Sequence, residues 1–327
     1  MKKILHFFCY FCLAGSAYPQ STAGITGKPD TSYSTYGAYI STLKTHPETK
    51  WVDELHIAAV TEKKNIIYCE MGERKLLLDV FHPSQESKKA RTAILIIHGG
   101  GWRTGNRTQH YPLAQRLANL GYVCITAEYR LSTEALFPAA VNDIKASLRW
   151  VRANAKAYNI DPEKIAVLGF SAGGELAAFM GTTNGITEFE GKDCLLSSSS
   201  NVQAVIDIDG ILAFIHPESG EGDDSKRISA ATNWFGYSKT ENPQLWKKGS
   251  PLTYAGKNTP PTLFINSGVD RMHAGRTDYI KILNEHKIYT EVKQFEGSPH
   301  SFCLFEPWFS PTVKYIDDFL VNIFGKP

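Results

Sequence analysis

The sequence has no excess of charge of either sign. It holds 35 Lys and Arg against 33 Asp and Glu, and two of the lysines are Lys2 and Lys3. Beyond these two the charges balance, and no stretch gathers basic residues. A neutral chain without a basic cluster does not favour binding to nucleic acid or to an anionic membrane. Nucleic acid is therefore not expected as a partner.

Cysteine is scarce as well. Beyond residue 20 the chain keeps four, namely Cys69, Cys124, Cys194 and Cys303. Their spacing matches no zinc pattern, and they are too sparse for a disulfide scaffold, although one bridge could form in an oxidising compartment. Cys124 lies in an apolar run and is expected to be a packed thiol. Since the histidines are also scattered, we expect no metal and no other cofactor.

The longest apolar run stands at the N-terminus. Lys2 and Lys3 precede the run from Ile4 to Leu13, and the small residues Gly15–Ala17 follow. The pattern is typical of a Sec-type signal peptide, and the run is too short for a stable membrane anchor. No cysteine follows that would favour a lipoprotein. We therefore expect residues 1–20 to be a signal peptide and the protein to be periplasmic or secreted, the alternative being a buried N-terminal helix.

At 327 residues and 43% hydrophobic content, the chain can bury the core of a single α/β domain. Residues 21–64 form an N-terminal extension, with 21–50 expected as an extended leader. From 65 to 327 a hairpin and then alternating strands and helices predict a mostly parallel sheet covered on both faces. Expected strands are 65–70, 75–81, 92–97, 122–127, 164–168, 202–208, 261–266 and 289–295. Expected helices are 111–119, one from 138 on, 175–180, 275–286 and 313–324. A polar segment at 212–256 interrupts this alternation and is expected to be a lid-like insertion over the active site.

A tight turn follows the apolar run 164–168. The sequence of Gly169–Gly173 is G-F-S-A-G. Glycines at both ends are required where a strand turns sharply into a helix, and Ser171 is expected in a strained backbone conformation that exposes its hydroxyl. Because the motif also arises by chance, its value depends on the residues around it.

Two later loops supply an acid and a base in the order that a hydrolase needs. Asp270 follows the strand 261–266 through a Gly-containing turn, and His300 follows the last strand. Both belong to the sheet edge where the nucleophile turn opens. His300 would accept the Ser171 proton, while Asp270 would orient the imidazole and stabilise its charged form. Three other carboxylates remain alternatives for the acid: Asp207, Asp209 and Asp278.

A glycine loop stands directly after the strand 92–97. Residues His98–Trp102 read H-G-G-G-W. The backbone N–H groups of Gly100 and Gly101, with that of Ala172, could hold the oxyanion of a tetrahedral intermediate. A phosphate-binding loop is disfavoured because no G-K-[ST] follows.

Four motifs together carry a resemblance to a known family: H-G-G-G-W, A-E-Y-R-L at 127–131, F-P-A-A at 137–140 with Asp143, and G-F-S-A-G-G. Over about residues 65–325 the chain resembles the hormone-sensitive-lipase-like branch of the α/β-hydrolase esterases. The resemblance implies the α/β-hydrolase fold and bracing roles for Tyr129, Arg130 and Asp143. It also implies a triad of Ser171, Asp270 and His300 with the second and third glycines of H-G-G-G as oxyanion donors. The chain departs from the family at the acid, where D-P-L-x-D is common and this sequence reads D-R-M-H; the extended N-terminal cap helices of many members are also not evident.

Within that branch the stretches 299–302 (P-H-S-F) and 304–309 (L-F-E-P-W-F) are similar to exported bacterial carbohydrate esterases that remove acetyl groups from pectin and related polysaccharides. This implies a serine carboxylesterase that acts through an acyl-enzyme on a small-molecule or oligosaccharide ester. Trp102 and Trp308, and also Trp234, could stack on sugar rings or could pack into the protein. Alternative functions are a peptidase of the same fold, a feruloyl or general carboxylesterase, and a non-catalytic binding module. The sequence leaves the oligomeric state open.

Overall fold

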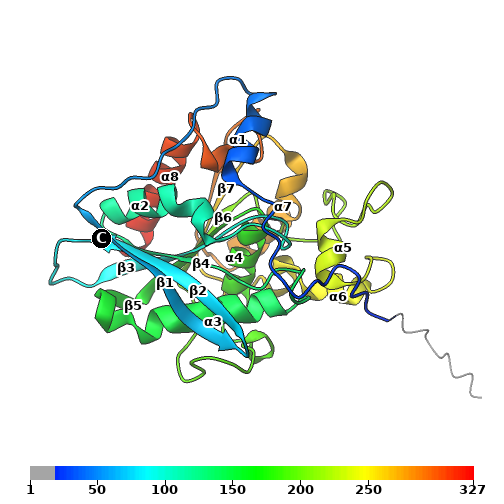
Figure 1. Cartoon of the computed structure of the whole chain (residues 1–327), viewed down its shortest axis with the longest axis horizontal. Coiled ribbons are helices and arrows are strands. Elements are labelled where there is room, and N and C mark those ends of the chain that lie inside the picture. Colours follow the sequence, from blue (N-terminus) through cyan, green and yellow to red (C-terminus); the bar gives the residue numbers. More distant parts are fainter. Residues whose placement is uncertain (1–18) are drawn as a thin grey trace, which may run out of the picture.

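The computed structural model describes residues 19–327, so the expected signal peptide lies almost entirely outside the described residues (Figure 1). One eight-stranded sheet runs through the molecule in the order β1-β2-β4-β3-β5-β6-β7-β8. The pairs β1–β2 and β2–β4 are antiparallel, and every other neighbouring pair is parallel. The strands are β1 Val60–Met71, β2 Arg74–Pro83, β3 Arg91–Ile97, β4 Val123–Ala127, β5 Ile160–Phe170, β6 Ala204–Ile208, β7 Thr262–Asn266 and β8 Thr290–Gln294.

Helices cover both faces of the sheet, as the sequence predicts. They are α1 Thr35–Leu43, α2 Tyr111–Asn119, α3 Ala139–Ala153, α4 Ala172–Thr182, α5 Ala230–Phe235, α6 Pro243–Lys248, α7 Arg276–Glu285 and α8 Phe309–Phe324. In Figure 1 α2 and α8 lie above the sheet and α3 below it. The alternation of side chains along a strand supplies both layers: in β3, Leu95 and Ile97 join the core cluster of α3 and α4, while Ile94 and Ile96 join that of α2 and α8.

The N-terminal extension differs from the expected leader because it contains α1. Ser34 caps this helix by accepting a hydrogen bond from the backbone N–H of Gly37. Tyr39 packs against the core cluster of α2 and α8, and the Thr42 hydroxyl lies 2.7 Å from that of Ser301. With only one buried residue, α1 carries little of the apolar periodicity from which a helix is recognised in a sequence.

The segment 212–256 forms α5 and α6 and is anchored by aromatic side chains. Phe214, Trp234, Phe235 and Trp246 are fully buried and contact one another. Trp234 also stacks on Trp102, with ring centroids 4.8 Å apart and an interplanar angle of 8°. The segment is therefore packed onto the domain, because these four side chains belong to the same core cluster as the buried residues of α3 and α4.

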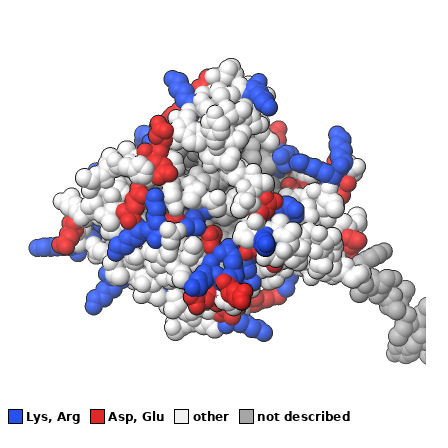
Figure 2. Space-filling view, viewed as in Figure 1, with Lys and Arg blue, Asp and Glu red and all other residues white. Residues whose placement is uncertain are grey.

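Charged side chains of both signs lie interspersed on the surface that Figure 2 shows, which agrees with the balanced composition. Of the helices in residues 19–327, none has the length and apolar character needed to cross a bilayer.

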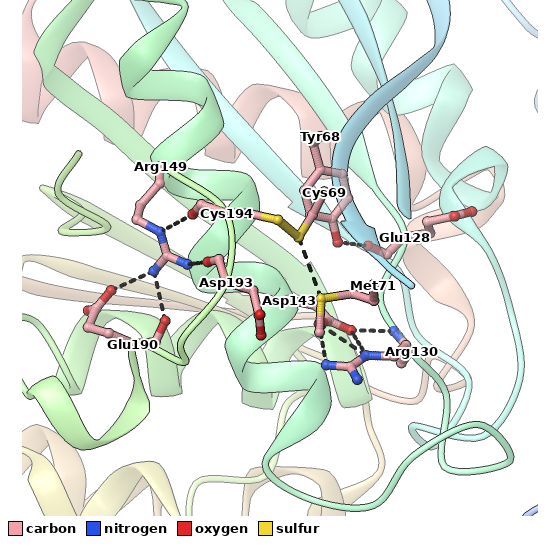
Figure 3. The surroundings of a disulfide bond; sticks show 10 residues. All are labelled: Tyr68, Cys69, Met71, Glu128, Arg130, Asp143, Arg149, Glu190, Asp193 and Cys194. Atoms are coloured by element: carbon pink, nitrogen blue, oxygen red, sulfur yellow. Dashed lines mark hydrogen bonds and ion pairs between the residues drawn. A yellow bond between two sulfur atoms is a disulfide. The ribbon is translucent and has the colours of Figure 1, made fainter. Parts of the chain in front are cut away.

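A disulfide joins Cys69 of β1 to Cys194 in the loop between α4 and β6, across a sequence separation of 125 residues (Figure 3). Arg149 of α3 holds the same loop, because its guanidinium donates to the carbonyl oxygens of Cys194 and Asp193, at 2.9 Å each, and to the Glu190 carboxylate. Cys124 is a buried free thiol, as expected. The bridge thus ties the antiparallel edge of the sheet to a loop that leads back into its centre.

We expect removal of the disulfide to lower the free energy of unfolding by about 3–5 kcal/mol, because a cross-link over so long a loop restricts the unfolded chain. Urea denaturation of a Cys69→Ala, Cys194→Ala double variant measures this. Dithiothreitol is the control: it should destabilise the wild type and leave the double variant unchanged. Equal stability of the oxidised wild type and the variant would contradict the expectation.

Candidate active site

The nucleophile turn joins β5 to α4, and its shape depends on two close backbone contacts. A Cβ atom at Gly169 would lie 1.8 Å from the carbonyl oxygen of Gly173, and one at Gly173 would lie 2.2 Å from that of Ile97 in β3. Neither position can carry a side chain. Ser171 adopts φ 58° and ψ −121°, the strained conformation that the motif predicts. Its hydroxyl therefore projects from the edge of the sheet at the start of α4.

Ser171 and His300 meet as the sequence predicts. The Ser171 Oγ atom lies 2.8 Å from His300 Nε2, and His300 Nδ1 lies 2.8 Å from Asp209 Oδ2. His300 is in the loop after β8, whereas Asp209 directly follows β6. The three side chains form a continuous hydrogen-bonded relay of hydroxyl, imidazole and carboxylate.

The prediction that Asp270 is the partner of the His300 imidazole is wrong, because Asp209 is the carboxylate hydrogen-bonded to Nδ1. Asp270 lies exposed at the start of a 3-10 turn, and no hydrogen bond joins it to His300. The sheet order explains the difference, because β6 is the immediate neighbour of β5, so a residue at its end lies close to the nucleophile turn. Asp270, by contrast, is separated from the end of β7 by residues 267–269 and is exposed. In the sequence, Asp209 is marked by its position directly after a buried strand, but that signal does not by itself separate it from Asp270.

Asp209 is fully buried and held at both carboxylate oxygens. Its Oδ1 atom accepts a hydrogen bond from the Ser267 N–H at 2.7 Å, and His273 Nε2 lies 3.5 Å from the same oxygen. Burial by itself raises the pKa of this carboxyl, but the His273 and His300 rings outweigh burial and bring the pKa to about 2. Asp209 is therefore an anion at neutral pH, as a group that stabilises an imidazolium must be.

The glycine loop approaches the nucleophile closely. Gly100 and Gly101 have φ values of 123° and 59°, and a Cβ atom at Gly100 would lie 2.1 Å from the carbonyl oxygen of Thr104. Gly100, Gly101 and Ala172 line one cavity with Ser171 and His300, and its volume is about 670 Å³. The structure thus brings the three expected oxyanion donors to the nucleophile and the base.

The two tryptophans expected to bind substrate lie in different places. Trp102 borders the cavity but is only 3% exposed, because it packs against Trp234 and donates its indole N–H to Glu175 Oε2 at 2.9 Å. Trp308 precedes α8 and packs edge-on against His46, away from the residues that line the cavity. Trp102 is therefore mainly a packing residue, and Trp308 is outside the site.

Glu175 is a feature of the site that the sequence reasoning missed. It lies fully buried in the first turn of α4 and connects the nucleophile helix to the glycine loop through the Trp102 indole. Burial raises its pKa well above the ordinary value, and the nearby Asp207 raises it further. Burial likewise raises the pKa of Asp207, whose Oδ1 atom accepts the N–H of Gly210. No sequence signal beyond adjacency to G-F-S-A-G-G marks Glu175.

The residues with implied bracing roles lie behind the glycine loop. The Tyr129 ring stacks on His98 at 4.4 Å, and its hydroxyl donates to the His98 carbonyl oxygen at 3.2 Å. Asp143 accepts hydrogen bonds from both the Arg130 guanidinium and the Arg130 backbone N–H. Within residues 19–327, no group of three or more His, Cys, Asp or Glu side chains is placed so that it could hold a metal ion.

A model of the BD-FAE family matches residues 78–274, which is more than half of the chain. The chain belongs to the BD-FAE family. Among curated relatives, Esterase LipQ of Mycobacterium tuberculosis is 29% identical over 266 residues, covering 78% of this chain and 61% of the relative. Esterase LipC of the same organism is 29% identical over 197 residues, covering 59% and 48%. The chain thus spans about half to three-fifths of the length of these relatives.

Solved structures confirm the α/β-hydrolase fold of this BD-FAE chain. The "Truncated form of carbohydrate esterase from gut microbiota" matches with a TM-score of 0.70 and 24% identity, covering 83% of this chain and 100% of that one. The butyrate-bound esterase Est2 of Thermogutta terrifontis matches with a TM-score of 0.67 and 26% identity, covering 82% and 96%.

The buried Glu175 predicts a pH dependence of stability. In the unfolded chain this carboxyl ionises near its ordinary pKa, whereas in the folded chain it stays protonated to higher pH, so the unfolded state binds fewer protons above about pH 4.3. Its contribution is complete below that pH and is lost as the pH rises towards the raised folded pKa. Glu175→Gln keeps an acceptor for the Trp102 indole and does not ionise.

We therefore expect the stability difference between Glu175→Gln and the wild type to shift in favour of the variant from pH 4.5 to pH 8. Urea unfolding at both values measures it. Glu175→Ala, which also removes the acceptor, is the control and should be less stable than Glu175→Gln at both. Parallel pH profiles of the wild type and Glu175→Gln would disprove the assignment.

Proposed function

We propose that the protein is a serine carboxylesterase that acts through an acyl-enzyme. The observation that carries the proposal is the hydrogen-bonded relay from Ser171 through His300 to Asp209, which opens into the cavity bordered by the glycine loop. A hydroxyl, an imidazole and an ionised buried carboxylate in this order are the constellation of hydrolases that activate a serine.

The reaction proceeds in two halves. His300 Nε2 takes the Ser171 proton as Oγ attacks the ester carbonyl carbon, and the resulting oxyanion accepts hydrogen bonds from the N–H groups of Gly100, Gly101 and Ala172. The C–O bond to the alcohol breaks while His300 returns the proton to the leaving oxygen. Water, deprotonated by His300, then attacks the acyl-enzyme and releases the acid, and Ser171 recovers its proton.

Asp209 supports both halves without accepting a proton. It fixes the imidazole with Nδ1–H toward the carboxylate and Nε2 toward Ser171, and it stabilises the imidazolium that forms in each transition state. Its low pKa keeps it charged throughout. Asp270 has no part in this mechanism.

The proposed substrate is a short acyl ester of a carbohydrate, in particular an acetyl ester of a plant cell-wall polysaccharide such as pectin. Named esterases among the relatives and a structural neighbour named as a carbohydrate esterase support an ester substrate. The cavity of about 670 Å³ is large enough for a sugar residue with its acyl group, and polar side chains border it.

We also propose that the protein is exported through the N-terminal signal and acts in the periplasm or outside the cell. The Cys69–Cys194 disulfide supports this location, because such bonds persist in oxidising compartments.

Ser171→Ala removes the attacking oxygen, and we expect it to lower kcat/KM for p-nitrophenyl acetate by about 10⁴-fold or more. A thermal melt that matches the wild type shows that the variant is folded. Full activity in Ser171→Ala would exclude the proposed nucleophile. Wild-type cleavage of an aminoacyl p-nitroanilide in place of the ester would support the peptidase instead.

Carboxylate-to-amide variants distinguish the two candidate acids. Asp209→Asn should lower kcat/KM by about 10³–10⁴-fold, because it removes the charge that stabilises the imidazolium. Asp270→Asn should change it less than about threefold, as should the control Asp278→Asn, whose side chain is exposed on α7. A large loss in Asp270→Asn with a small one in Asp209→Asn would reverse the assignment.

A further inference from the structure

The lining of the active-site cavity includes two exposed arginines whose guanidinium groups have no partner in the described chain. Arg227 and Arg271 line the cavity that also holds Ser171 and His300. Neither makes an ion pair or a hydrogen bond with any of residues 19–327. Two arginines without a partner thus border the space that a bound substrate would fill.

These two arginines differ from all others in the described chain. Every other arginine in residues 19–327 donates to, or forms an ion pair with, the protein; these are Arg74, Arg91, Arg103, Arg107, Arg116, Arg130, Arg149, Arg152 and Arg276. Arg103, which borders the same cavity, pairs with Asp30 at 3.8 Å. Arginines of the described chain therefore generally have a hydrogen-bond or ion-pair partner, and the two without one both line the active-site cavity.

The acidic side chains beside the cavity are engaged by their own loop. Glu221 Oε2 accepts the backbone N–H of Ala231 at 3.1 Å. Asp223 Oδ1 accepts the backbone N–H and the hydroxyl of Ser225, at 3.2 and 2.6 Å. Neither carboxylate lies within ion-pair distance of Arg227 or Arg271, so these acids do not take the place of an external anion.

The backbone that carries each of the two arginines is held in place by neighbouring residues. Arg271 lies between the exposed Asp270 and two buried residues, Met272, which borders the cavity, and His273, which contacts the triad acid. Its aliphatic stem packs on Gly220, where a Cβ atom would lie 3.1 Å from Arg271 Cδ. The D-R-M-H sequence that departs from the family motif thus places a cation beside the reaction centre.

Arg227 is held by a separate loop. Asp224 Oδ1 accepts the backbone N–H of Ser229 at 2.7 Å, and Asp224 also accepts the Thr232 hydroxyl of α5. This closes the loop of residues 224–229 onto the start of α5 and fixes the backbone that carries Arg227.

A carboxylate is a suitable ligand for the two guanidinium groups of Arg227 and Arg271, because a guanidinium matches the planar geometry of a carboxylate with paired hydrogen bonds.

Resting on the proposed esterase function, we infer that Arg227 and Arg271 determine substrate specificity by binding a carboxylate on the alcohol part of the ester. The substrate class is then an acylated acidic oligosaccharide built of uronic acid residues, rather than a neutral one. The two arginines contact the sugar acid while Ser171 attacks the acyl group.

The test compares acetylated oligogalacturonate with the same oligosaccharide after methyl esterification of its carboxylates. At low ionic strength we expect the wild type to favour the acidic form by about five- to tenfold in kcat/KM, the size of two solvent-exposed charge pairs. An Arg227→Gln, Arg271→Gln double variant should bring the ratio to about one. Added salt should reduce the wild-type preference, because it screens exposed charges.

Lys226→Gln is the matched control: it removes the same charge from the neighbouring exposed position outside the cavity and should keep the wild-type ratio. A wild-type ratio of one, or a preference that survives in the double variant, overturns the inference. Wild-type cleavage of p-nitrophenyl acetate reports on the proposed function separately. If this ester is cleaved and the ratio is one, only the proposed carboxylate-binding role of the arginines is disproved. If no ester is cleaved, the proposed esterase function is disproved.

Discussion

The site depends on one backbone constraint, the close contact of β3, β5 and α4 around Gly169 and Gly173. Because the carbonyl oxygen of Ile97 lies only 2.2 Å from where a Cβ atom at Gly173 would be, α4 starts directly against the end of β3. That contact brings the H-G-G-G loop, which continues β3, to the start of the nucleophile helix. It also imposes the positive φ of Ser171. Nucleophile and oxyanion donors are therefore placed by the same packing.

Most of the fold could be predicted because its strands and helices carry strong, regular patterns. β3, β4, β6 and β7 are short buried runs, and α2 was predicted with its observed bounds. The nucleophile turn and the glycine loop could also be recognised in the sequence, since close steric contacts require glycine at these positions. Elements that dock with few apolar side chains, such as α1, leave no such pattern and could not be found.

The acid could not be chosen from the sequence because the choice depends on sheet order. Asp209 and Asp270 both follow buried strands, and residue type alone does not separate them. Asp209 lies beside the nucleophile turn because β5 and β6 are paired neighbours in the sheet, which only the structure shows. The buried His273 then reinforces the choice, since it contacts Asp209 from a turn more than sixty residues away in the sequence. Such long-range proximity is a property of the packed structure.

Three buried carboxyls lie close behind the reaction centre, and their surroundings shift their pKa values in opposite directions. Asp209 accepts hydrogen bonds from the Ser267 N–H and His300, lies beside the His273 ring, and has a pKa of about 2. Glu175 has the single Trp102 indole at one oxygen, and Asp207 the Gly210 N–H, so burial dominates and their pKa values rise. The raised pKa matters most at Glu175, whose indole partner, Trp102, directly follows the proposed oxyanion donors. A second buried anion there would oppose the negative charge that develops on the substrate oxygen, whereas a protonated carboxyl can brace the loop without that electrostatic cost.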